Sequence, residues 1–188
     1  MAKQYWKAGN MLYPLPAVMV SLTDGDGNPN IITVAWTGTC CTNPPMVYIS
    51  IRKERFSYAL LKETKEFVIN LTTENLTFET DFCGVTSGKD IEKFEKLNLT
   101  PIPSKYVKAP SIKESPVNIE CKVKEIIPLG SHDMFLAEVL GVTVEEEYMD
   151  KDNRFHLEWA NPIAYSHGQY YTLGENKGKF GFSIKKSK

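Results

Sequence analysis

The chain has 188 residues, with 22 basic and 23 acidic side chains and a formal net charge of −1. Hydrophobic residues make up 42% and charged residues 24%, which is typical of a globular domain. A chain of this length can bury about 70% of its unfolded surface, so we expect a single domain over 1–188, with a basic C-terminal tail from about residue 175. The near-neutral charge argues against a general nucleic-acid binder, and no apolar run approaches the ~20 residues of a membrane helix. The N-terminal stretch has no secretory-signal pattern.

Cysteine and histidine usage argues against a metal site or a disulfide framework. The four cysteines are scattered apart from one adjacent pair: Cys40, Cys41, Cys83 and Cys121. No C-x-x-C is present, and the three histidines share no metal-ligand spacing. We therefore expect four thiols in a reducing cytoplasm and no bound metal.

The first half of the chain alternates short strands with one helix. Apolar, β-branched runs at 17–22 and 31–36 flank a turn-rich segment, which predicts a β-hairpin. Residues 46–52 predict a third strand. The pattern changes to helical spacing over 55–64.

The second half predicts a strand at 66–72, then two short helices at 75–82 and 90–97. The Pro-rich passage 101–116 is expected to be loop. Residues 118–127 and 134–149 alternate apolar with polar side chains, which predicts two long antiparallel strands. Most connections are too short for the crossover helix that parallel pairing requires. The sequence therefore predicts a mainly β protein, an antiparallel barrel or strongly curved sheet with peripheral helices.

The sequence contains none of the common nucleotide-binding motifs. Nothing matches G-x-G-x-x-G or the phosphate-binding P-loop, so no dedicated dinucleotide or nucleoside-triphosphate site is predicted.

Two features suit a flat, anionic aromatic cofactor such as flavin mononucleotide, FMN. Strand residues 31–36 run into the small-residue stretch Thr37, Gly38 and Thr39, which can present backbone N–H groups beside the aromatic wall of Trp36. The alternative is that Trp36 is an ordinary core residue.

The second feature is a basic run before the predicted helix. Arg52, Lys53 and Arg55 precede a first helical turn that contains Ser57. Cations, a hydroxyl and free N–H groups at a helix start together form a phosphate receptor. The alternative is a solvated, charged edge.

The chain resembles the flavin reductase-like family with the FMN-binding split-barrel fold, and within it the flavoredoxin-type branch. The resemblance runs from Tyr13 to about Ser183. It rests on the order and spacing of these segments: PLPAVMVSL from Pro14, NIITVAW from Asn30, NPPMVYISI from Asn43, RFSYALLKETKEFVINL from Arg55, DFCGVTSGKDIEKF from Asp81, APSIKESPVNIECKV from Ala109, GSHDMFLAEV from Gly130 and YYTLGENKGKFGFS from Tyr170.

The resemblance implies a set of cofactor-binding positions. The ring and ribityl chain would be contacted around Asn30 and the strand end, the phosphate would be held by the hydroxyl and the basic run, and a lysine would favour the extra negative charge of a reduced flavin. The implied residues are Asn30, Val34, Ala35, Trp36, Thr37, Gly38, Thr39, Arg52, Lys53, Ser57, Lys93, His132 and Tyr165. Of these, His132 lies beside the flavin in the family and is the candidate catalytic residue.

The implied function is an FMN-binding oxidoreductase. Electrons would come from NADH, NADPH or a reduced partner protein, and would leave to free flavin, an iron–sulfur protein or another acceptor. The resemblance also implies a homodimer, with the aromatic segment 165–173 as an interface element. The four thiols indicate a cytoplasmic location. Two alternatives remain: a flavoredoxin-like electron carrier without NAD(P)H activity, and a non-enzymatic flavin-binding module.

Two departures from the family pattern bear on these alternatives. Many members carry an acidic residue before the histidine, where this chain has Ser131. The loop CCTNPP replaces a serine-rich version, but no spacing makes Cys40 or Cys41 catalytic.

Overall fold

The computed structural model describes residues 1–184. The strands are β1 (Leu15–Pro16), β2 (Val18–Thr23), β3 (Pro29–Val34), β4 (Thr37–Thr42), β5 (Pro45–Arg52), β6 (Glu66–Asn70), β7 (Pro101–Ile102), β8 (Ser111–Ile112), β9 (Val117–Pro128), β10 (His132–Val144), β11 (Ile163–Ser166) and β12 (Gln169–Thr172). The helices are α1 (Phe56–Thr64), α2 (Thr77–Val85), α3 (Lys93–Lys96) and the 3-10 turns η1 (Glu74–Leu76), η2 (Glu146–Tyr148) and η3 (Leu157–Ala160).

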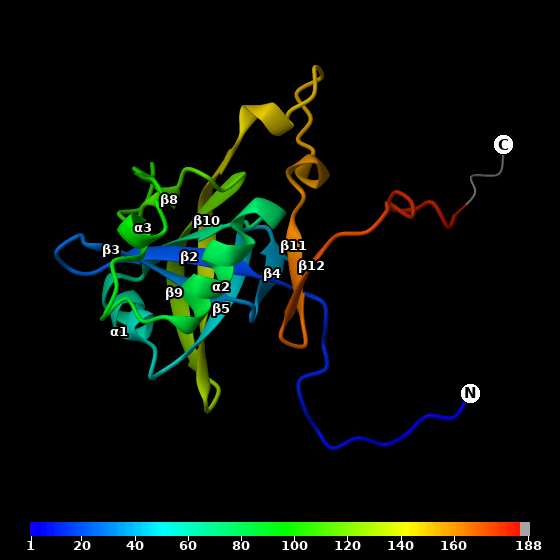
Figure 1. Ribbon diagram of the computed structural model, residues 1–188, viewed down its shortest axis with the longest axis horizontal. Helices are drawn as coiled ribbons and strands as arrows, with labels where there is room; N and C mark the ends of the chain where they lie inside the picture. Colours follow the sequence, from blue (N-terminus) through cyan, green and yellow to red (C-terminus); the bar gives the residue numbers. More distant parts are fainter. Residues whose placement is uncertain (185–188) are drawn as a thin grey trace.

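The described residues form one large antiparallel sheet. It has seven strands in the order β3-β2-β6-β9-β10-β5-β4. Figure 1 shows the helices α1, α2 and α3 beside this sheet and the hairpin β11–β12 next to β4. A three-stranded sheet, β1-β11-β12, and the two-stranded β7-β8 complete the architecture. The expected mainly β fold with peripheral helices is confirmed.

The chain connection between the two edge strands forces the large sheet to close. Strands β3 and β4 lie at opposite edges, yet only Ala35 and Trp36 join them. Such a link spans roughly 11 Å, whereas the edges of a flat seven-stranded sheet would lie about 29 Å apart. The sheet therefore curls until β3 contacts β5. The link itself continues the β4–β5 pairing, because the Ser50 N–H of β5 donates to the Trp36 carbonyl at 2.8 Å.

Apolar side chains fill the inside of this curled sheet and the space beneath the helices. Leu22, Ile49, Phe67 and Phe135 are fully buried inside the sheet. A second cluster packs α2 and α3 against the outer face of β2 and β3; it contains Met19, Ile31, Leu76, Cys83, Phe94, Leu97, Leu99 and Ile112. The helices are thus held against the strands that carry residues 29–34.

Most of the strands and helices expected from the sequence are present, but several expectations were wrong; the strand expected over 66–72, for example, ends at Asn70. The expected loop 101–116 contains the short pair β7–β8, and the strand expected over 134–149 ends at Val144. The helix expected over 90–97 covers only 93–96, and the strand expected to reach Trp36 ends at Val34. Strands β4 and β11–β12 were not predicted. The edge strands β4 (TGTCCT) and β12 (QYYT) lack the alternation of a half-buried strand, and β11 (IAYS) has only four residues.

Both ends of the described chain extend away from the body (Figure 1). Of the expected basic tail, Lys177 and Lys179 are exposed, whereas Lys185, Lys186 and Lys188 lie outside the described residues. None of the helices within residues 1–184 has the length and apolar character needed to cross a bilayer.

A buried amide connects four strands near the centre of the sheet. The Asn70 side chain is fully buried, and its Nδ2 donates to the Met19 carbonyl and to Ser21 Oγ, both at 2.9 Å. Its Oδ1 accepts from the Ile112 N–H at 3.0 Å and from Asn118 Nδ2 at 2.9 Å. One side chain therefore satisfies polar groups of β2, β8 and β9 from its own strand β6.

We expect Asn70→Ala to lower the free energy of unfolding by about 3 kcal/mol, because it leaves several buried polar groups without a partner. Urea unfolding measures the change. Asn75→Ala, at an exposed position of η1, is the control and should change it by less than about 0.5 kcal/mol. A loss below about 1 kcal/mol for Asn70→Ala would contradict this account of the network.

Candidate functional site

A cavity of about 310 Å³ lies where the two edges of the curled sheet meet. We call it the main cavity. Its walls come from the end of β3 and the following link, from β5, from α2 and from the hairpin β11–β12. The lining residues include Ile32, Thr33, Val34, Ala35, Trp36, Ser50, Arg52, Arg55, Asp81, Gly84, His132, Tyr165 and Tyr170.

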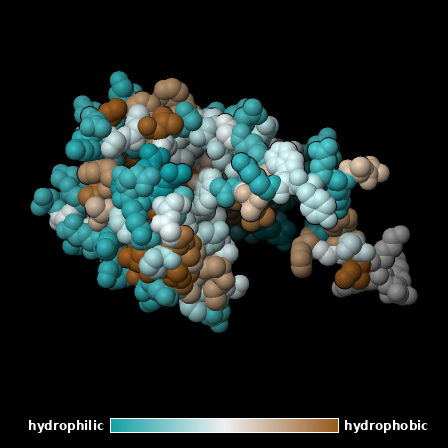
Figure 2. Space-filling model, turned by 90° about the horizontal axis from the view of Figure 1, so that it is seen from below, coloured by the Kyte–Doolittle hydropathy of each residue, from teal (hydrophilic) through white to brown (hydrophobic). Residues whose placement is uncertain are grey.

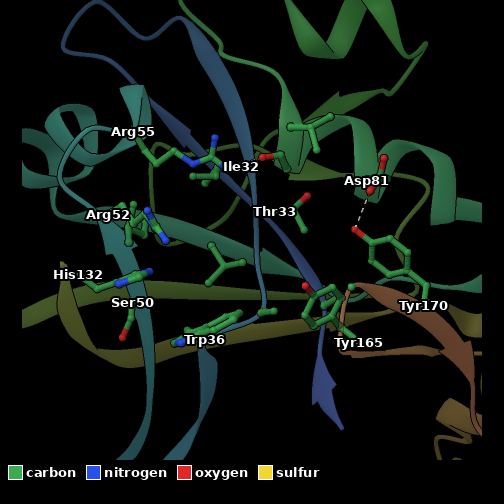
Figure 3. A pocket seen from close by; sticks show the side chains of 17 residues that line it. Ile32, Thr33, Trp36, Ser50, Arg52, Arg55, Asp81, His132, Tyr165 and Tyr170 are labelled. Atoms are coloured by element: carbon green, nitrogen blue, oxygen red, sulfur yellow. Dashed lines mark hydrogen bonds between the residues drawn. The ribbon is translucent and has the colours of Figure 1, made fainter. Parts of the chain in front are cut away.

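The two ends of the main cavity differ in chemistry (Figure 3). Arg52, Arg55 and His132 gather at one end, and Tyr165 and Tyr170 lie at the other. An anionic ligand entering this cavity is therefore drawn toward the arginine end.

The tyrosine end is closed by a hydrogen bond between distant parts of the chain. The Tyr170 hydroxyl on β12 donates to Asp81 Oδ1 on α2 at 3.1 Å (Figure 3). Burial, followed by the nearby Asp81 charge, raises the pKa of Tyr170 to about 12. The phenol therefore stays protonated and remains a donor at neutral pH.

Two flat side chains form the wall at the sheet seam. The rings of Trp36 and His132 are nearly parallel, with 7° between their planes and 6.2 Å between their centroids. Ser131 Oγ lies 2.9 Å from His132 Nδ1. Since a hydroxyl carries no charge, the position before the histidine supplies no carboxylate to this imidazole.

A side cavity of about 90 Å³ adjoins the main cavity, and the two share Ile32 and Arg55. It lies at the N-terminus of α1 and is also lined by Glu54, Phe56, Ser57, Thr86, Ser87, Gly88 and Lys93. Ser57 Oγ accepts a hydrogen bond from Asn30 Nδ2 at 2.8 Å. A Cβ atom at Gly88 would come within 2.0 Å of Asn30 Oδ1, so glycine is required where this loop approaches Asn30.

Two cations flank the side cavity, and neither is paired with a carboxylate among the described residues; Glu54, which also lines this cavity, pairs with Arg52. The Lys93 side chain is buried, and its Nζ donates to the carbonyl oxygens of Ile31, at 2.7 Å, and Cys83, at 2.9 Å. Arg55 donates to the Gly84 carbonyl. Within residues 1–184, no carboxylate lies within ion-pair distance of either cation. Burial lowers the pKa of Lys93 to about 8.

The structure brings many of the sequence-predicted site residues together. Val34, Ala35, Trp36, Arg52, His132 and Tyr165 line the main cavity, and Ser57 and Lys93 line the side cavity. Asn30 does not line the side cavity, but its side chain is hydrogen-bonded to Ser57, which does.

Other predicted residues lie elsewhere. Thr37, Gly38 and Thr39 belong to β4 and do not line either cavity; Thr37 Oγ1 donates to the Tyr48 carbonyl at 2.7 Å. Lys53 pairs with Asp133 at 3.2 Å. Neither Cys40 nor Cys41 lines either cavity.

Sequence reasoning left several lining residues out of the predicted set. Arg55 belongs to the predicted basic run, but nothing in the sequence indicates that it lies between two cavities. The residues Ile32, Thr33, Asp81, Gly84, Ser87, Gly88 and Tyr170 also line the cavities. Asp81 and Tyr170 are separated by 89 positions, so only the folded chain brings them together.

The sequence profile of the flavin reductase like domain matches residues 11–174. The chain belongs to this family. Relatives include an uncharacterized protein of Archaeoglobus fulgidus, 32% identical over 88% of this chain and 92% of its own length. Another, from Aquifex aeolicus, is 31% identical over 90% of each chain.

Solved structures agree with this membership. The flavoredoxin of Desulfovibrio vulgaris (Miyazaki F) has a TM-score of 0.91 and 32% identity, covering 97% of this chain and all of its own (100%). An FMN-binding protein from Thermus thermophilus has a TM-score of 0.80 at 20% identity, covering 95% of this chain and 99% of its own, and that likeness concerns the fold alone. The predicted family and the split-barrel fold are therefore confirmed.

The low pKa of Lys93 predicts a pH-dependent stability. Between about 8 in the folded state and the ordinary value of 10.5, the unfolded chain holds the extra proton. The free energy of unfolding should therefore rise with pH across this window, by at most about 1.4 kcal/mol per pH unit. Urea unfolding of ligand-free protein from pH 7.5 to 10.5 measures this rise.

Lys93→Met should lose this rise, because it lacks the titrating group. Lys96→Met, at an exposed position of the same helix, should keep it. Parallel pH curves for the wild type and Lys93→Met would contradict the assignment.

Proposed function

We propose that the chain is an FMN-binding oxidoreductase. It passes electrons from NADH, NADPH or a reduced partner protein through bound FMN to free flavin, an iron–sulfur protein or another acceptor. The observation that carries this proposal is the pair of adjoining cavities: an aromatic-walled main cavity and a small side cavity flanked by two cations without carboxylate partners.

The residues present fit FMN, which combines a flat ring with a phosphate. A volume of about 310 Å³ lies within the usual range for small-ligand sites. An uncompensated buried cation is costly for a protein unless an anion approaches it. We assign the ring to the main cavity and the phosphate to the side cavity.

Four kinds of donor surround the proposed phosphate position. They are the Ser57 hydroxyl, the Arg55 guanidinium, the Lys93 ammonium and the free N–H groups at the start of α1. Charge-assisted hydrogen bonds from such groups are roughly twice as strong as neutral ones. Because an anion favours the protonated ammonium, binding should also raise the pKa of Lys93 above its ligand-free value.

FMN, when bound, supplies the redox chemistry, and the protein's residues bind and orient it. Trp36 provides a flat wall, and Arg52 and Arg55 provide positive potential at the ring's polar end. The Tyr165–Tyr170 end limits how far the ring can slide. In this arrangement His132 is the candidate for contact with the reacting face.

The proposal also covers how the electron donor would bind. Since the sequence has no dinucleotide-binding motif, a nicotinamide would be held only transiently against the ring. We also propose a homodimer, and a cytoplasmic location, which the four free thiols favour.

A second candidate is an electron carrier that is reduced by a partner protein and not by NAD(P)H. Two observations favour it. The neighbour with a TM-score of 0.91 is a flavoredoxin, and Ser131 supplies no charge beside His132.

An anaerobic absorbance spectrum separates these functions. The purified protein is loaded with FMN, then mixed with stoichiometric NADH or NADPH. We expect the absorbance of the bound flavin near 450 nm to bleach within seconds for one donor. His132→Ala should slow the bleaching while FMN stays bound, because only the contact at the reacting face is lost.

Each other outcome changes the assignment. Bound flavin that resists both donors but is bleached by dithionite would favour the protein-fed carrier. A protein that takes up no FMN would contradict the flavin assignment, including the non-enzymatic flavin-binding module.

A further inference from the structure

A buried carboxylate lies beside the main cavity without lining it. Hydrophilic side chains cover much of the molecular face shown in Figure 2, whereas Asp133 on β10 is only 4% exposed. It directly follows His132, and successive side chains of a strand point to opposite faces of the sheet. His132 therefore lines the main cavity, while Asp133 lies on the inner face with the core residue Phe135.

This carboxylate has one partner on each oxygen, and both partners come from the segment that follows β5. The Tyr58 hydroxyl on α1 donates to Asp133 Oδ2 at 2.7 Å. The Lys53 ammonium lies 3.2 Å from Asp133 Oδ1. The Tyr58 ring also packs edge-on against Phe135, with 5.7 Å between the ring centroids. Because a carboxylate buried in this way is costly without partners, Asp133 fixes where Lys53 and Tyr58 lie relative to β10.

The two partners lie on either side of residues that line the side cavity. A tight turn joins β5 to α1, and it is closed by the Arg55 N–H, which donates to the Arg52 carbonyl at 3.1 Å. Lys53 lies within this turn. Tyr58 lies in the first turn of α1, and its N–H donates to the Arg55 carbonyl at 2.9 Å. Between these two partners are Arg55 and Ser57, which line the side cavity. One buried carboxylate thus holds both the turn and the start of the helix.

We propose that Asp133 is a positioning residue for the phosphate of FMN. Through Lys53 and Tyr58 it fixes the turn and the first residues of α1, which carry the donors around the proposed phosphate position. Asp133 itself lines neither cavity, so it acts only through these two side chains. This inference rests on the proposed function for the identity of the ligand.

The protonation states at neutral pH suit this arrangement. The hydrogen bond from Tyr58 is the largest influence on Asp133 and, with the Lys53 ammonium, lowers the pKa of its carboxyl against the opposing effect of burial. The same hydrogen bond raises the pKa of Tyr58. The carboxylate is therefore charged and the phenol is a donor. Because these bonds are already made in the protein alone, the donors around the phosphate position need less ordering when the ligand binds.

The pairing also separates two possible roles of Lys53. A lysine that only anchors the turn aids phosphate binding as long as Asp133 holds it. A lysine that binds the phosphate directly would instead be freed for that task when Asp133 loses its charge. The two roles therefore predict opposite changes in FMN affinity after the same substitution.

The test compares FMN with riboflavin, which has the same ring and ribityl chain but no phosphate. Titrations that follow flavin fluorescence give both dissociation constants for the full-length wild type and for Asp133→Asn. The asparagine amide can still accept the bond from Tyr58, but it has no charge to hold Lys53. The matched control is Glu138→Gln. Glu138 is also on β10 and pairs with Lys124 at 2.8 Å, but it lies opposite the far end of β5 from the turn.

We expect Asp133→Asn to weaken FMN binding by about tenfold and riboflavin binding by less than about twofold, because only the phosphate depends on the turn. Glu138→Gln should change neither constant. Equal losses for the two ligands would mean a general structural role for Asp133 and would overturn the proposal. Unchanged or stronger FMN binding would overturn it as well, and stronger binding would make Lys53 a direct phosphate ligand.

A second variant tests the same ion pair from its more exposed partner, and it keeps the proposal testable if Asp133→Asn does not fold. The Lys53 side chain is 51% exposed, so Lys53→Met should fold. It should weaken FMN binding and leave riboflavin binding unchanged. The double variant Lys53→Met with Asp133→Asn should bind FMN no more weakly than Asp133→Asn alone, because both substitutions remove one interaction. Additive losses would contradict a shared role.

Amide hydrogen exchange of the ligand-free protein tests the positioning without any flavin. The Arg55 N–H closes the turn and the Tyr58 N–H bonds to the next carbonyl along, so both should exchange faster in Asp133→Asn and Lys53→Met than in the wild type and Glu138→Gln. Unchanged exchange at both amides would overturn the proposal. A protein that binds neither FMN nor riboflavin would overturn the proposed function, and the amide exchange would still decide whether Asp133 holds the turn.

Discussion

The short link of Ala35 and Trp36 between the two edge strands of the sheet determines the architecture. Because this link joins strands at opposite edges, the seven-stranded sheet closes on itself and brings β3 beside β5. The main cavity lies at this seam, between the ends of β3 and β5. One covalent constraint thus creates the barrel and leaves its opening lined by Trp36.

The second organising interaction is the buried ammonium of Lys93. It bonds to carbonyl oxygens of β3 and α2, so it holds the helical layer against the strand that leads into the seam. The same cation flanks the side cavity with Arg55, and neither has a carboxylate partner among residues 1–184. Packing and the proposed anion site therefore depend on one side chain. This explains why a polar residue occupies an otherwise apolar position.

Local patterns in the sequence were enough to predict the antiparallel fold, whereas most of the candidate site residues came from the resemblance to the flavin reductase-like family. The strand leading to Trp36 and the run around Arg52 and Ser57 carry residue types that can be recognised without a structure. The contact between Asp81 and Tyr170, which closes the tyrosine end of the main cavity, could not be predicted. It joins helix α2 to β12, a short edge strand far away in the sequence. Lys53 shows the converse error, because a local pattern placed it in the site and the structure places it elsewhere. It belongs to the basic run, but the buried carboxylate of Asp133 holds it outside both cavities.

The most direct test of the two-cavity account is a crystal structure of the protein with FMN bound. We predict the phosphate within hydrogen-bond distance of Ser57 and Arg55 in the side cavity, and the ring in the main cavity against Trp36. A phosphate inside the main cavity, beside Arg52 and His132, would contradict the account. So would a ring bound outside the seam.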